Sequence, residues 1–398
     1  MLQNIVKSAL MAATICLLGN PSGYAFDLSS GDVQITGRAG SYWGQATDNN
    51  EHSTTEDAVS HFQNTNEMNL RFVTLHGAFL GYMELEARSH ATTGSEAQAK
   101  NLAAVQTFIS FMPSRSFDVT FGSLLDLEYS SFAVGSGLAS FSAIPTYQGW
   151  ETSLYTEGDG IKFRYKHPKI KAGLSLYSTS AGSTNGLGRG TATNVFAGGK
   201  YGPLEFRASS ISETGSDNQT ITSDDAGKTE SKSTFVGARF SITPEMSISL
   251  DTYSSEIEFS KNLINKNSSM ALQARVKKIG PGNIVFTYAT TTHKNDSTAA
   301  ASGMVFYATS AAVFDFNPTD TVAGTNTQFP YTFNQKVEIS DLGLIYELPM
   351  ADNGSRLQIF YMNKTIKASD PLMLGTYALA TEFTRIQSQI GAGVWLNF

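Results

Sequence analysis

The sequence is poor in cysteine and in long apolar runs, and each scarcity excludes a class of protein. Cys16 is the only cysteine among the 398 residues, so no framework of disulfides holds the chain together. No segment carries the roughly 18 successive apolar residues that a membrane-spanning helix requires. Acidic residues number 35 against 28 lysines and arginines, and this net charge of −7 argues against a nucleic-acid partner.

Histidine is also scarce, and its spacing does not suggest catalysis. The 6 histidines lie far apart along the chain, and no two have the H-x-x-x-H spacing of a zinc site. His76 lies on a predicted strand, where a barrel lipase would need a nearby serine nucleophile, but its surroundings mark none. We therefore expect no enzymatic activity, no metal site and no cofactor.

The first residues have the pattern of a secretory signal peptide. Lys7 is their only charge, Ala9 to Leu18 form a short apolar run, and Gly23-Tyr24-Ala25 places small residues at both recognition positions. The apolar run is too short to span a bilayer. The pattern predicts cleavage after Ala25, so that residues 1–25 are removed and residues 26–398 form a single domain.

The last nine residues alternate between apolar side chains and small, polar or amphipathic ones. Every second position from Ile390 to Phe398 is apolar, and the residues between are Gly391, Gly393, Trp395 and Asn397. A period of two indicates a strand with one apolar face. Such a strand invites aggregation when it lies open in water, whereas a closed barrel in lipid needs one to seal it.

Similar alternation recurs along the whole chain, in segments separated by short turns. Proline marks many of these turns, because it has no amide hydrogen to donate to a strand ladder. The segments predict an all-β protein, a transmembrane antiparallel β-barrel of about sixteen strands. We predict these strands at 32–43, 67–77, 79–90, 104–112, 116–126, 158–166, 169–179, 193–201, 203–212, 233–242, 245–258, 268–278, 282–293, 336–348, 355–366 and 386–398.

The connections between the predicted strands alternate between short and long. Short turns at one end and long loops at the other are the layout of an outer-membrane barrel, with periplasmic turns and extracellular loops. The segment 294–335 is long enough to hold two more strands, so eighteen strands remain an alternative. The long connections lie at 44–66, 91–103, 127–157, 180–192, 213–232, 259–267, 294–335 and 367–385.

Aromatic residues gather at one depth of the predicted barrel. Six aromatic residues lie on the apolar face of their strands, and each is close to a short turn or to the end of the chain. Aromatic rings at a shared depth indicate the boundary between lipid and water. These membrane-boundary aromatics are Phe117, Tyr165, Phe206, Phe240, Tyr346 and Phe398.

These features together resemble the general diffusion porins of Gram-negative bacteria. Val33 to Gly40 resembles their first strand, Phe79 to Ala87 their third, and Phe117 to Gly122 the fifth, which leads into a loop folded into the pore. Ile390 to Phe398 matches their C-terminal aromatic signal. The likeness is one of pattern over the mature chain, and the acidic Pro-Glu-Phe-like stretch of the family's inward loop has no clean copy here.

The resemblance implies a pore constriction between an inward loop and the barrel wall. The loop would be the segment at about 127–157, with Asp126 and Glu128 as its acidic side. Arg38, Arg71 and Arg88 would form the basic wall opposite, because arginine stays charged and can be held by its neighbours. Opposite charges across a narrow lumen favour polar solutes over apolar ones.

Further basic residues face the lumen by alternation and lie near short turns. They are Lys162, Arg164, Lys171, Arg207, Arg239, Arg275 and Lys277. We expect them to line the periplasmic vestibule, where they make a mild preference for anions conceivable. The sequence does not decide the sign of the selectivity.

The resemblance implies an outer-membrane porin that lets small hydrophilic solutes and ions diffuse passively. It further implies a homotrimer, contact with outer-membrane lipid and lipopolysaccharide, and recognition of Phe398 by the barrel-assembly machinery. Two alternatives stay open at this point. One is a channel with a saturable site for a sugar, a phosphate or a nucleoside, and the other is an adhesive or structural surface barrel with a plugged lumen.

Overall fold

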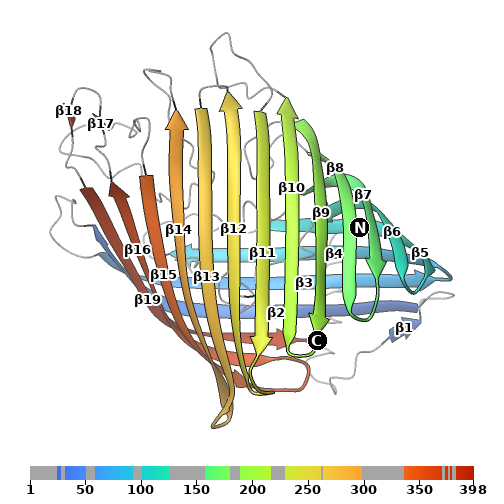
Figure 1. Ribbon diagram of the computed structural model, residues 1–398. Helices are drawn as coiled ribbons and strands as arrows, with labels where there is room; N and C mark the ends of the chain where they lie inside the picture. The colour runs from blue at the N-terminus through green and yellow to red at the C-terminus, as the bar shows by residue number, and fades with distance from the viewer. Residues whose placement is uncertain are drawn as a thin grey trace.

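The strands of this chain form one sheet that closes on itself (Figure 1). The computed structural model describes residues 25–27, 32–50, 59–92, 101–125, 132, 157–179, 189–216, 229–260, 263–297, 336–369, 373–374, 377–378 and 382–398. Within these ranges, no helix has the length and apolar character needed to cross a membrane. The predicted signal peptide lies outside them, apart from its last residue.

The closed sheet is an antiparallel barrel of 16 strands, which confirms the predicted fold class. Each strand pairs with its neighbours in chain order, and β19 closes the ring by pairing with both β16 and β2. In Figure 1, β10 to β14 run steeply across the front while β2 to β4 cross behind them, as in a barrel of tilted strands. The barrel strands are β2 (Asp32–Asn50), β3 (Val59–His76), β4 (Phe79–Thr92), β5 (Asn101–Ser114), β6 (Phe117–Leu125), β7 (Glu157–Lys166), β8 (Ile170–Thr179), β9 (Arg189–Tyr201), β10 (Leu204–Ser216), β11 (Thr229–Ser241), β12 (Met246–Ser260), β13 (Leu263–Ile279), β14 (Gly282–Ser297), β15 (Lys336–Pro349), β16 (Arg356–Ser369) and β19 (Glu382–Asn397).

Three short strands lie beside this ring. β1 (Ala25–Asp27) pairs with the start of β2, and β17 (Met373–Leu374) pairs with β18 (Tyr377–Ala378) in a separate sheet. β14 pairs directly with β15 from Asn283 to Lys294, so no further strand lies between these two in the wall. The structure therefore decides between the two predicted strand numbers in favour of sixteen.

Several predicted long loops are shorter than expected, because the strands around them extend further. β12 reaches Ser260 and β13 begins at Leu263, so the predicted loop 259–267 is wrong. β2 and β3 pair as far as Asp48 and Val59, inside the predicted loop 44–66. The alternation of apolar and polar residues becomes irregular in these stretches, so the pattern does not predict the strands there. The backbone hydrogen bonds between the strands continue because they do not depend on the side chains.

Short turns gather at one end of the barrel, which we call the short-turn end. Seven turns lie there, at 77–78, 115–116, 167–169, 202–203, 242–245, 280–281 and 350–355. Gly202 and Gly280 have positive φ angles of 55° and 58°, a backbone conformation that residues with a Cβ rarely adopt. The predicted sorting of connections by length is right, with the β12–β13 connection as the exception.

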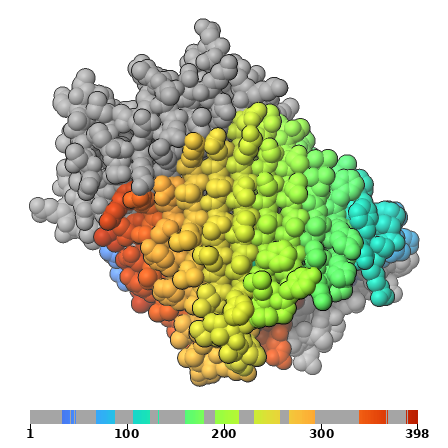
Figure 2. Space-filling model, in the orientation of Figure 1, coloured from blue at the N-terminus to red at the C-terminus, as the bar shows by residue number. Residues whose placement is uncertain are grey.

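Alternate residues of each strand lie on opposite faces of the wall. On β11, Thr234 and Val236 are exposed, whereas Ser233 and Phe235 between them are buried. Figure 2 shows the outer side of these strands as one continuous surface. An apolar exterior of this extent would aggregate in water, but lipid tails solvate it in a bilayer. The large apolar side chains exposed on the outer face include Ile109, Phe121, Phe163, Leu176, Val195, Leu250, Leu272, Leu344, Ile359 and Ile390.

The C-terminal residue helps to close the barrel. The Phe398 amide donates to the Gly37 carbonyl at 2.9 Å, and the Gly37 amide donates to the Phe398 carbonyl at 2.8 Å. A Cβ on Gly37 would lie 2.7 Å from the Phe398 ring. Glycine therefore leaves room for the terminal ring to cover the neighbouring strand.

Candidate pore lining

Basic side chains line the inner face of the barrel near the short-turn end. We assign a residue to the inner face when it alternates with the exposed apolar residues of its own strand, or pairs across the ladder with such a residue. We call this set the basic belt. It comprises Arg38, Arg71, Lys162, Arg164, Lys166, Lys171, Lys200, Arg207, Arg239, Arg275, Lys277 and Arg356.

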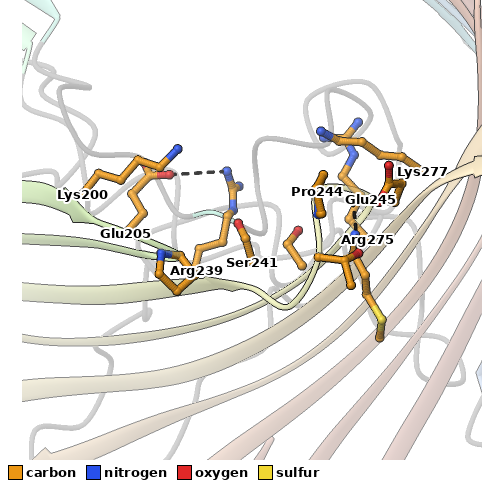
Figure 3. A pocket seen from close by; sticks show the side chains of 12 residues that line it. Lys200, Glu205, Arg239, Ser241, Pro244, Glu245, Arg275 and Lys277 are labelled. Atoms are coloured by element: carbon orange, nitrogen blue, oxygen red, sulfur yellow. Dashed lines mark hydrogen bonds and ion pairs between the residues drawn. The ribbon is translucent and has the colours of Figure 1, made fainter.

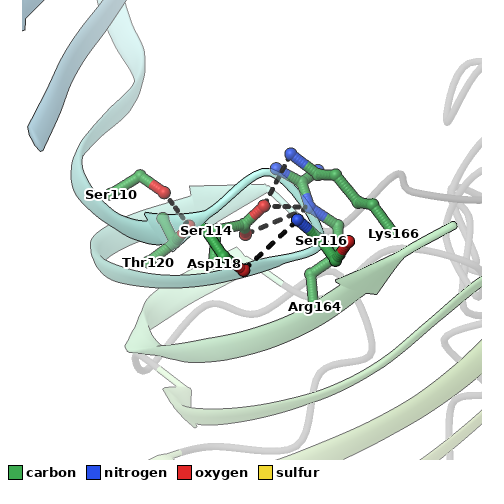
Figure 4. A network of polar contacts seen from close by, with 7 residues as sticks. All are labelled: Ser110, Ser114, Ser116, Asp118, Thr120, Arg164 and Lys166. Atoms are coloured by element: carbon green, nitrogen blue, oxygen red, sulfur yellow. Dashed lines mark hydrogen bonds and ion pairs between the residues drawn. The ribbon is translucent and has the colours of Figure 1, made fainter. Parts of the chain in front are cut away.

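One part of the belt surrounds a buried carboxylate on β6 (Figure 4). The Arg164 Nε donates to both carboxylate oxygens of Asp118 at 3.1 Å, and the Lys166 Nζ lies 2.6 Å from Oδ2. Beside this pair, the Ser110 and Thr120 hydroxyls are 3.0 Å apart. A buried carboxylate needs such partners, since a charge without them is strongly destabilising. Two cations therefore meet this one acid on the inner wall.

A second part of the belt holds an aromatic ring that belongs to no strand. Phe132 is 1% exposed, and its ring centroid lies 4.0 Å from the Arg207 Cζ and 4.3 Å from the Arg239 Cζ. The Arg207 Nη2 donates to Glu205 at 2.9 Å, and Arg239 lies 3.9 Å from the same carboxylate. Both guanidinium groups therefore face the electron-rich ring, which is the geometry of a cation–π interaction.

Phe132 comes from the segment predicted to fold into the pore. It follows β6 and packs on β10 and β11, where a Cβ on Gly237 would lie 3.2 Å from its ring. It is the one residue of 127–156 that the structure describes. A bulkier residue at position 237 would compete with the ring for this space.

A third part of the belt surrounds Glu347 on β15. Arg275 donates a hydrogen bond to this buried carboxylate, and the Gln358 Nε2 donates to it at 2.8 Å. The Arg356 Nε lies 3.9 Å from the carboxylate. Charge-assisted hydrogen bonds from several directions stabilise the ionised acid on the inner wall.

Two arginines also flank the indole ring of Trp395 on β19. The Cζ of Arg38 lies 5.2 Å from the ring centroid, and that of Arg356 lies 5.8 Å from it. The same indole belongs to a small buried apolar cluster on the inner wall, together with Val285, Ile345, Phe360 and Met362. The inner face is thus mainly polar but not uniformly so.

The residues predicted for the constriction have different outcomes. Arg38 and Arg71 lie on the inner face, and the Arg71 Nε is 3.3 Å from Glu84. Glu84 also accepts hydrogen bonds from Asn69 and Tyr82. Arg88 lies on β4, but its side chain is outside the described part of the chain, as are Asp126 and Glu128. The role of all five in a constriction stays a prediction.

The residues predicted for the vestibule lie on the inner face near short turns. Arg164, Arg207, Arg239 and Arg275 make the contacts described above, and the Lys162 Nζ lies 5.5 Å from the Phe196 ring centroid. Lys171 and Lys277 lie on the same face of β8 and β13. Their role in the vestibule stays a prediction.

The aromatic residues predicted for the membrane boundary lie on the outer face at the short-turn end. Phe117, Tyr165 and Phe240 are exposed, and the Tyr346 hydroxyl donates to the Ile279 carbonyl at 3.4 Å. Phe206 lies on the outer face of β10, and Phe398 on that of the closing strand. This placement suits contact with lipid headgroups, a role that itself stays a prediction.

Sequence reasoning missed several residues of this lining. Asp118, Glu347 and Arg356 occupy inward positions of clearly alternating strands, so parity would have found them. The alternation of residues gives no sign of which side chains contact Trp395, or of where Phe132 lies. Phe132 lies in a segment without periodicity, and contacts between distant strands leave no trace in local spacing.

Similarity to known proteins is found at the level of the fold. No protein-family model matches the sequence, and the search of curated proteins finds no relative. The chain is similar to the structure of Salmonella typhi OmpF in complex with daunomycin, with 13% identity and a TM-score of 0.55 over 94% of this chain and 100% of that one. It is also similar to an anion-selective porin from Comamonas acidovorans, with 14% identity and a TM-score of 0.53 over 92% and 100% of the two chains. The outer membrane channel DcaP of Acinetobacter baumannii has 11% identity and a TM-score of 0.52 over 93% and 99%. At these identities the likeness concerns the fold, and it shows that this chain has the closed 16-strand barrel of Gram-negative outer-membrane porins.

Proposed function

We propose that this chain is a non-enzymatic outer-membrane porin through which small hydrophilic solutes and ions diffuse passively. The observation that carries the proposal is the opposite chemistry of the two faces of the closed wall. Exposed apolar side chains cover the outer face, and charged side chains from most of the strands line the inner one. Only a barrel that has lipid outside and water inside uses both faces in this way.

The membrane that suits this barrel is the Gram-negative outer membrane. The proteins with the same fold named above include porins and an outer-membrane channel. We propose that lipid and lipopolysaccharide solvate the apolar band and that the barrel-assembly machinery reads the strand ending at Phe398. By the same family resemblance we propose a homotrimer, which chemical cross-linking of the detergent-extracted protein tests directly.

Planar bilayers provide the test of the channel itself. Full-length protein refolded into lipid should insert in discrete conductance steps, with current proportional to voltage and to salt concentration. A reversal potential in a salt gradient then reports which ion permeates faster. Membranes that stay silent after verified insertion would refute the proposal and favour a plugged surface barrel.

A further inference from the structure

A hollow of about 220 Å³ opens on the inner wall at the short-turn end, between β9 and β13 (Figure 3). Four basic residues line it: Lys200, Arg239, Arg275 and Lys277. Glu205 and Glu245 are its two acidic residues. The hollow therefore brings four of the cations of the basic belt to one place.

Both carboxylates of the hollow also contact cations that do not line it. Glu205 accepts a hydrogen bond from Arg207 at 2.9 Å. Glu245 accepts one from the Lys278 ammonium at 2.9 Å, and this contact holds the pKa of Glu245 below its ordinary value. These outside cations offset part of the negative charge that the two acids bring to the hollow.

The lysines of the hollow differ from its arginines in their partners. Arg275 is hydrogen-bonded to Glu347, and Arg239 lies 3.9 Å from Glu205. In the described part of the chain, no ion pair joins Lys200 or Lys277 to an acid. The hollow and the charged groups that act on it together hold six cations (Lys200, Arg207, Arg239, Arg275, Lys277 and Lys278) against four carboxylates (Glu205, Glu245, Glu347 and Asp251, which acts on Arg239).

We propose that this hollow is a binding site for oxyanions of the phosphate class, where a passing anionic solute pauses at the mouth of the channel. Ammonium groups supply strong point charges, and guanidinium groups offer paired donors that match the oxygens of a phosphate. Because the four cations line one concave wall, their fields reinforce one another inside the hollow. The inference rests on the proposed channel function, which it makes specific for a class of solute.

Free solute, rather than a lipid headgroup, is the ligand that the position favours. Lys200 and Lys277 lie on the inner face, whereas the boundary aromatics Phe206 and Phe240 lie on the outer face of the same region. A lipid phosphate outside the barrel therefore faces the rings and not the hollow. Inorganic phosphate and pyrophosphate are suitable probes, because they carry the charge without a lipid tail.

The test compares three variants of the full chain in planar bilayers. Phosphate added to a chloride solution should block the wild-type current in a saturable way. The double substitution Lys200→Gln/Lys277→Gln should raise the half-blocking concentration about tenfold or more, because two charged donors are lost. Lys200→Arg/Lys277→Arg should keep most of the block. Lys232→Gln/Lys367→Gln removes the same charge from outward positions near the other strand ends and should leave the block unchanged.

Each outcome separates this inference from the proposed function. A conducting wild type without phosphate block, or equal block in both Gln double variants, would overturn the site while leaving the channel intact. If the membranes are silent, calorimetric titration of the refolded wild type and the Lys200→Gln/Lys277→Gln variant with pyrophosphate in detergent decides. Heat from the wild type alone then supports the site, and equal heats from both refute it.

Discussion

Replacement of Phe132 by leucine tests whether the cation–π contacts with Arg207 and Arg239 hold this residue on the wall. We call this pair of contacts the clamp. The ring is almost fully buried, while the side chains of Arg207 and Arg239 are 24% and 30% exposed. A cation–π contact contributes about 0.5–1 kcal/mol when exposed and about 2 kcal/mol when desolvated. We therefore assign about 1 to 2 kcal/mol to each of the two contacts, and about 2 to 4 kcal/mol to both. Leucine keeps the apolar bulk and removes only the π face.

The expected consequence is a large shift in the population with residue 132 docked on the wall. At about 1.4 kcal/mol per factor of ten, the loss corresponds to a shift of roughly 30- to 700-fold. Single-channel recordings should show this as increased current noise in Phe132→Leu. Urea unfolding of the protein folded in liposomes, followed by tryptophan fluorescence, should show the same destabilisation as a lower midpoint.

A double-mutant cycle isolates the contact itself. Phe132→Leu and Arg239→Gln should show a coupling energy of about 1 to 2 kcal/mol, because each substitution removes the same contact. Glu205 keeps its bond to Arg207 in both variants. Phe121→Leu is the matched control, since Phe121 is an exposed ring on the outer face. A coupling energy below about 0.3 kcal/mol, within the usual error of such cycles, would refute the clamp.

Three further predictions follow from the wall. Asp118→Asn should lower the free energy of unfolding by about 2 to 4 kcal/mol, because Arg164 and Lys166 on β7 both lose their counter-charge. Urea unfolding measures this loss, and a change under about 0.5 kcal/mol would contradict it. Val236→Arg should cost about 2 to 4 kcal/mol of folding stability in liposomes, whereas Val236→Leu should be nearly neutral; equal stabilities would argue against a lipid-facing position. The pKa of Glu245 is lowered by Lys278, so the stability from this pair is complete above the ordinary pKa of a glutamate and is lost as the pH falls through the lowered value. The wild type should therefore lose slightly more stability than Glu245→Gln on acidification, and the opposite order would be inconsistent with the pair.

The strands and the face of each side chain were predictable here, because lipid contacts one face of a barrel wall and water contacts the other. Alternation placed Arg239 and Arg275 on the inner face and Phe240 on the outer one, and the pairing of the strands agrees. Prediction failed where the pattern became irregular, as at 259–267, because backbone hydrogen bonds continue a ladder whatever the side chains are.

Partnerships across the wall were beyond local reasoning for a physical reason. Arg275 and Glu347 are 72 residues apart and lie on strands that are not neighbours in the sheet. The inward curvature of the closed wall brings their long side chains together. Phe132 contacts Arg207 and Arg239 from a segment outside the barrel strands. The sequence of that segment gives no sign of which residues it contacts.

The sequence by itself determined the faces of this protein, because lipid and water impose a period of two on every strand that separates them. Only the closed tertiary structure decided which charges meet. The curvature of the wall sets the distance between side chains on strands that are not neighbours, and with it the site where Lys200 and Lys277 face one hollow.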